Sequence, residues 1–133
     1  MRYLAAYGAS ALALLVLDAV WLTTMADRLY RPVLGDWMVT KVNLAPAVIF
    51  YLLFLAGLTF LATIPGLKEG SVTRVIINAA VFGFVAYATY DLTNQATLVR
   101  WSPIITIVDM AWGTFLSVSG AVAGYYAARL VPA

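Results

Sequence analysis

The chain has 133 residues, of which 64% are hydrophobic and only 11% are charged, and its formal net charge is +2. A soluble globular domain is about half apolar and about a quarter charged, so this composition predicts a protein of the lipid bilayer, and the few charges exclude the basic patch with interleaved aromatics that nucleic acid requires. The chain has no cysteine and no histidine, which excludes disulfides, thiolate chemistry, iron–sulfur clusters and the usual zinc and haem ligands, so we expect neither a metal nor another cofactor.

Four apolar stretches are long enough to cross a hydrocarbon core of about 30 Å as α-helices. They cover approximately residues 3–25, 44–64, 75–96 and 104–128. The first is too long for the apolar part of a signal peptide and contains Asp18, so we interpret it as a retained span. Short connections make neighbouring helices antiparallel. We therefore expect an all-α, up-down bundle of four transmembrane helices that forms a single domain, 1–133, with the N and C termini on the same side.

The connections carry their own signals. Residues 27–43 mix cationic and aromatic side chains with apolar ones, which is typical of either a short interfacial helix or a loop resting on the membrane. Pro65-Gly66 predicts the end of the second span. Ser102 followed by Pro103 predicts the N-cap and the first helical position of the fourth span.

Three spans carry one aspartate each, at Asp18, Asp91 and Asp109. Each aspartate lies five to seven residues from the span end opposite the termini. At about 1.5 Å per residue this predicts a common depth of roughly 7–11 Å. Polar groups in hydrocarbon cost free energy unless they find partners, and three at one level exceed what helix packing needs. We take the three aspartates as candidate catalytic residues that share protons.

Other polar and aromatic residues are expected around these carboxylates. Tyr87, Asn94 and Gln95 fall on the helical face of Asp91. Residues 17–23 and 108–114 both read apolar-Asp-x-x-Trp-x-Thr, so each tryptophan lies one turn from its aspartate. Because the two helices are antiparallel, we expect one indole above and one below the carboxylates. The candidate ligand-binding residues are Trp21, Lys41, Tyr87, Asn94, Gln95, Arg100 and Trp112, with the lysine and the arginine as counter-charges.

The motifs around the aspartates also carry a family resemblance. They are Leu-Asp-x-x-Trp-Leu at 17–22, Tyr-Asp-Leu-Thr-Asn-Gln-Ala-Thr-Leu at 90–98 and Asp-Met-Ala-Trp-Gly-Thr at 109–114. They resemble a family of small bacterial predicted membrane proteins of unknown function, DUF2177, and the resemblance extends over the whole chain. It implies the four-helix architecture, these residues and a multi-pass location in the bacterial inner membrane, and it supplies no reaction.

A cluster of three carboxylates suits several functions. It suits holding the polar head of an amphipathic, lipid-like molecule, or acid–base catalysis on such a ligand. It also suits proton- or cation-coupled transport, for which a four-helix protomer would act as a homo-oligomer. In a structural or accessory subunit of a larger membrane complex, the same carboxylates would hold helices together or dock a partner. We favour a membrane protein that binds or acts on an amphipathic small molecule near one membrane interface, with no nucleic-acid partner.

Lysine and arginine are equally distributed between the two predicted membrane faces. Each face carries four of them: Arg2, Lys68, Arg74 and Arg129 beside the termini, and Arg28, Arg31, Lys41 and Arg100 on the other. If Lys41 and Arg100 pair with the carboxylates, the remaining charges favour termini in the cytoplasm.

Overall fold

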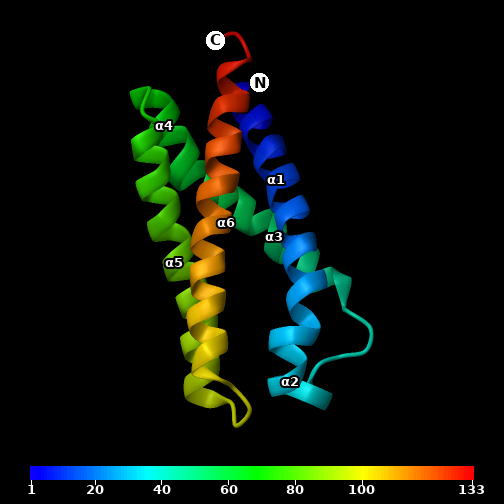
Figure 1. Cartoon of the computed structure of the whole chain (residues 1–133). Coiled ribbons are helices and arrows are strands. Elements are labelled where there is room, and N and C mark those ends of the chain that lie inside the picture. Colours follow the sequence, from blue (N-terminus) through cyan, green and yellow to red (C-terminus); the bar gives the residue numbers. More distant parts are fainter.

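The computed structural model describes all 133 residues and contains helices without strands (Figure 1). The helices are α1 (Arg2–Met25), α2 (Arg31–Leu34), α3 (Leu44–Leu58), α4 (Ile64–Glu69), α5 (Val72–Thr97) and α6 (Pro103–Arg129). Several follow one another without a break, which leaves four long apolar helices that can cross a membrane: Arg2–Trp37, Leu44–Glu69, Val72–Thr97 and Pro103–Arg129. The four-helix membrane architecture is therefore confirmed.

Both chain ends lie at the same end of the bundle (Figure 1). There the Arg2 side chain donates a hydrogen bond from Nε to the carbonyl oxygen of Ala128, at 3.2 Å. We call this the terminal end. The opposite end, where α2 and the α5–α6 connection lie, is called the α2 end.

Helix α6 is central to the bundle, packing along both α1 and α5, while α3 crosses obliquely behind α6 and α1 (Figure 1). Small residues permit the close approach of the helices. Ser10 on α1 donates a hydrogen bond to the Gly120 carbonyl oxygen at 2.8 Å, and a Cβ added at Gly124 would overlap the Ser10 hydroxyl. These glycines therefore serve packing between helices of one chain, a common use of small residues on membrane helices.

The second long helix does not end where the proline predicts. A π-helical turn over Thr59–Thr63 leads into α4, which passes through Pro65 and ends at Glu69. A proline in a helix leaves the carbonyl four residues earlier without its N–H donor. Here that carbonyl belongs to Leu61, and the Asn78 side chain on α5 donates to it at 3.0 Å. The prediction of an end at about residue 64 was wrong because a neighbouring helix replaces the missing hydrogen bond.

The first long helix also extends beyond its predicted end. After Met25 the backbone continues through a π-helical turn (Ala26–Tyr30), α2 and a 3₁₀ turn (Gly35–Trp37), so only residues 38–43 of the expected connection are non-helical. Of the two alternatives for this segment, the helical one is correct. By contrast, α6 begins as expected, since Ser102 Oγ accepts a hydrogen bond from the Ile104 amide at 3.1 Å and Pro103 is the first helical residue.

Candidate functional site

The three aspartates come from three different helices, and all are withdrawn from the surface. Asp18 on α1 is 8% exposed, Asp91 on α5 is fully buried, and Asp109 on α6 is 8% exposed. Asp91 and Asp109 are neighbours across the contact between α5 and α6; we call them the carboxyl pair. Asp18 is not part of the pair, and the three together do not form a group that could hold a metal ion.

Two tryptophans and a tyrosine connect Asp18 to the carboxyl pair. Trp112 Nε1 donates to Asp18 Oδ1 at 3.3 Å, and Trp21 Nε1 donates to the Tyr30 hydroxyl at 3.1 Å. Tyr30 in turn donates to Asp109 Oδ1 at 2.6 Å. The two indoles stack with their centroids 4.4 Å apart and their planes 8° from parallel. The result is one continuous polar and aromatic array across α1 and α6.

The tryptophan stack corrects the expectation of one indole above and one below the carboxylates. Side chains on a helix tilt towards its N-terminus. Trp21 leaves α1 on the α2 side of its aspartate and tilts back towards the terminal end, whereas Trp112 leaves α6 on the terminal side and tilts towards the α2 end. The two rings therefore approach each other and meet face to face.

Tyr30 is a site residue that the sequence analysis missed, because it lies in the segment assigned to the membrane surface. A regular helix would place Leu29 in line with Asp18 and Met25. The π-helical turn over Ala26–Tyr30 contains one extra residue per turn, which brings Tyr30 into that line instead. The only signal in the sequence is a polar aromatic residue shortly after a span that carries an aspartate.

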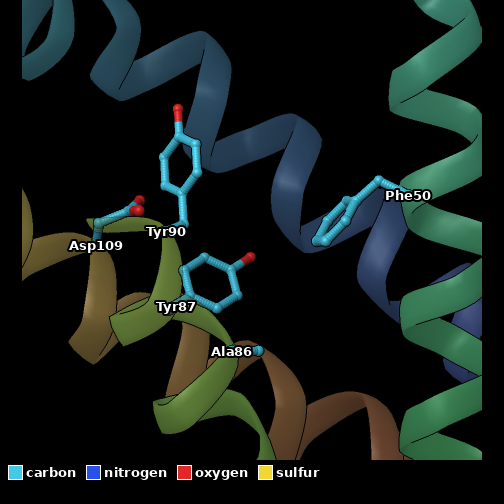
Figure 2. Close-up of a pocket in the computed structure, with 5 residues that line it drawn as sticks. All are labelled: Phe50, Ala86, Tyr87, Tyr90 and Asp109. Atoms are coloured by element: carbon cyan, nitrogen blue, oxygen red, sulfur yellow. The ribbon is translucent and has the colours of Figure 1, made fainter. Parts of the chain in front are cut away.

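A pocket of about 310 Å³ opens next to the carboxyl pair. Its walls come from α3, α5 and α6, and it is lined by Phe50, Ala86, Tyr87, Tyr90 and Asp109. Figure 2 shows the Phe50 ring facing Tyr87 across the space, with Asp109 on the far side of Tyr87 and Tyr90. The pocket is thus largely aromatic and has one carboxyl group in its wall.

Tyr87 keeps its place in this wall because α6 has a glycine opposite. A Cβ built at Gly113 would overlap the Tyr87 ring, so any larger residue would push the ring into the pocket. Tyr87 also packs edge-on against Phe54 of α3, with centroids 6.3 Å apart. Of the expected ligand-binding residues, Tyr87 is the one that lines the pocket.

The expected counter-charges do not reach the carboxylates. Arg100 instead pairs with Asp36 and lies over the Trp37 ring, 5.4 Å from its centroid. Lys41 is exposed in the non-helical segment after the 3₁₀ turn and forms no ion pair. The argument for cytoplasmic termini assumed that these two cations bind the aspartates, and that assumption does not hold.

Asn94 and Gln95 do not bind the Asp91 carboxylate either. No donor of the protein reaches either oxygen of Asp91. Gln95 accepts a hydrogen bond from Thr106 at 2.7 Å, and Thr106 in turn accepts one from Trp101 at 3.0 Å. These contacts join α5, its following loop and α6 at the α2 end, one turn beyond the carboxyl pair.

The Asp36–Arg100 pair is expected to hold the 3₁₀ turn against the α5–α6 connection. We predict that Asp36→Asn speeds amide hydrogen exchange in residues 26–37. The Asp36–Arg100 ion pair joins the 3₁₀ turn to the α5–α6 connection, so its loss should let residues 26–37 open more often. Glu69→Gln is the matched control, since Glu69 pairs with Arg74 at 3.1 Å outside residues 26–37. Equal exchange in the two variants would show that the cross-link does not order this segment.

The fold and this site define a polytopic helical membrane protein with buried carboxyl groups at an aromatic pocket. The chain belongs to the family described as predicted membrane protein, DUF2177, whose sequence profile matches residues 3–126. Comparison with curated proteins and with solved structures gave no significant match.

Proposed function

We propose that this protein binds the polar head of an amphipathic small molecule at the carboxyl pair, with the apolar part of the ligand between α3 and α5. The observation that carries the proposal is the state of Asp91, which is fully buried and receives no hydrogen bond from the protein. Its neighbour Asp109 lines the pocket and is the carboxyl group that a ligand there would meet first. The bacterial inner membrane, where the family resemblance locates such proteins, would supply the ligand.

The chemistry of the pair supports a bound partner. Two neighbouring carboxyl groups in a low-dielectric interior need hydrogen-bond donors to compensate for their lost hydration. Neither oxygen of Asp91 has such a donor within the protein. A buried acceptor without a partner costs about 1–3 kcal/mol, and donors on a ligand head would remove that cost.

The rest of the array supports a preformed site. Tyr30 donates to Asp109 Oδ1, so this carboxyl group is held in one orientation. The tryptophan stack holds Tyr30 through Trp21. A ligand that enters the pocket therefore meets a fixed acceptor and rigid aromatic walls, which lowers the ordering cost of binding.

The position of the site within the bundle favours ligand binding over transport of a proton or a cation. Between the site and the terminal end the bundle is filled by a cluster of buried apolar side chains that includes Leu14, Leu58 and Leu116. The Ser10 and Ser117 hydroxyls in this region donate to the Gly120 and Gly113 carbonyl oxygens. This packing supports a site that is reached from the side of the bundle.

Native mass spectrometry of the purified protein tests the proposal. We expect a defined small molecule to be retained by the wild type and lost by Asp91→Asn, because the amide replaces one acceptor oxygen by an NH₂ donor. Asp27→Asn is the control, since its carboxylate is exposed and lies outside the site. A product mass present with wild type and absent with Asp109→Asn would show turnover in addition to binding.

Two results would contradict the proposal. Equal retention of the molecule by wild type and Asp91→Asn would place the ligand elsewhere. No retained molecule in any sample, together with an unstable Asp91→Asn protein, would make the carboxyl pair a structural element of the bundle.

A further inference from the structure

A second hollow continues the pocket towards the terminal end. It measures about 430 Å³ and is lined mostly by apolar residues of α5, with Leu61 from the opposite helix: Leu61, Asn78, Val81, Phe82, Val85 and Ala86. Ala86 also lines the first pocket. The two hollows therefore follow the same boundary between α5 and the long helix Leu44–Glu69, and together we call them the α5 groove.

The length of the α5 groove matches a lipid chain. It extends along α5 from Asn78 to Tyr90, which at about 1.5 Å per residue is roughly 18 Å. Half of a hydrocarbon core of about 30 Å is slightly less than this. The one amide in the groove is already engaged, since Asn78 donates to the Leu61 carbonyl oxygen at 3.0 Å. The groove thus offers an apolar path for one extended chain.

The head end of the groove contains acceptors and no cation. Asp91 receives no hydrogen bond from the protein, and Asp109 receives one from Tyr30. Neither of the two expected cations reaches the head end of the groove. Arg100 pairs with Asp36, and Lys41 is exposed. A phosphate or carboxylate head would therefore bring acceptor oxygens against acceptor oxygens, whereas a head with N–H or O–H donors would be stabilised.

Resting on the proposed function, we infer that the ligand is a single-chain amphiphile with a hydrogen-bond-donating head that carries no negative charge, a long-chain amine or alcohol, whose tail lies in the α5 groove. The head donates to Asp109, the member of the carboxyl pair that lines the pocket. The tail runs past Ala86 towards Asn78. Ala86 lines both hollows, so a tail that extends from the first hollow into the second must pass this residue.

Binding of four probes to the protein in lipid nanodiscs tests this inference: hexadecylamine, hexadecanol, hexadecyl phosphate and octylamine. We expect the amine or the alcohol to bind at least about tenfold more tightly than the phosphate, whose oxygens would face the carboxyl oxygens with no cation between them. The relative affinity of hexadecylamine and hexadecanol then identifies the head as cationic or neutral.

Variants of the groove test the placement of the tail. Val85→Trp, at an exposed position that lines the second hollow and not the first, should weaken the hexadecyl probes by about tenfold or more and change octylamine by less than about twofold, since a short chain buries little area in the second hollow. Ala86→Phe is a second obstruction, at the residue common to both hollows, and should weaken the short and the long probes alike. Ala111→Phe, on an exposed face of α6, is the matched control.

The outcomes separate this inference from the function on which it rests. Hexadecyl phosphate binding as tightly as the amine, in a manner that depends on Asp91, would overturn the head assignment and leave the proposed function standing. Unchanged hexadecyl binding in both groove variants would overturn the tail assignment in the same way. Failure of all probes to bind overturns the inference, and binding that Asp91→Asn leaves unchanged contradicts the proposed function itself.

Discussion

Replacing Gly83 by alanine is expected to force α5 away from α6 and to destabilise the protein by about 1–3 kcal/mol, the usual cost of overpacking a closely packed interior. A Cβ at Gly83 would lie 2.6 Å from the Ser117 Cβ and 2.8 Å from the Gly113 carbonyl oxygen. The backbone oxygen cannot rotate away, so the helices must separate. Unfolding in a mixed detergent titration, followed by circular dichroism, measures the loss.

The same substitution at Gly8 is the control. Nothing lies within 4 Å of a Cβ built there, and alanine is the better helix former, so Gly8→Ala should be neutral or stabilise by up to about 1 kcal/mol. Since α5 and α6 also carry the carboxyl pair, Gly83→Ala should reduce ligand retention together with stability. Equal unfolding curves for the two variants would show that the α5–α6 contact is less close than described.

Tyr30→Phe is expected to cost about 1–3 kcal/mol, because it removes the donor to Asp109 Oδ1 and leaves a nearly buried carboxyl oxygen without a partner. The Tyr30–Asp109 hydrogen bond is 2.6 Å long, and the tyrosine also accepts from Trp21 at 3.1 Å. A double-mutant cycle with Asp109→Ala isolates the pair, because alanine offers the tyrosine no acceptor. We expect the two changes together to cost less than their sum, since either one removes the same hydrogen bond.

Tyr3→Phe is the matched control for this cycle, because Tyr3 is exposed near the terminal end. Its hydroxyl is not part of the polar array, so its loss should leave stability and ligand retention unchanged. Additive costs for Tyr30→Phe and Asp109→Ala would show that the tyrosine stabilises the α1 extension without acting on the carboxyl group.

The Asp91 and Tyr30 variants probe different parts of the site. Asp91→Asn changes an acceptor that the protein leaves without a donor, so its main effect should fall on the ligand. Tyr30→Phe changes a group that positions Asp109, so its effect should fall on stability and ligand retention together. This difference separates a residue that contacts the ligand from one that orients its neighbour.

The sequence by itself determined the number of helices and the burial of the aspartates. Long apolar stretches have to form helices in a bilayer, because every backbone N–H and C=O must be satisfied within the segment. Asp18, Asp91 and Asp109 had to face the interior, because an ionisable group pointing into hydrocarbon is costly. Both inferences rest on composition and on one-dimensional spacing, which need no knowledge of how the helices pack.

Tertiary structure alone decided which groups meet. The rotation and tilt of the helices place Asp91 next to Asp109, and they bring Asp18 to the Trp112 indole, which donates a hydrogen bond to it. One extra residue in a π-helical turn brought Tyr30 to the site. Arg100 pairs with Asp36 because the first helix continues past its apolar stretch and so places Asp36 beside the α5–α6 connection. Contacts of this kind depend on packing between helices that are distant in sequence, and a shift of a single residue per turn changes which side chains face each other.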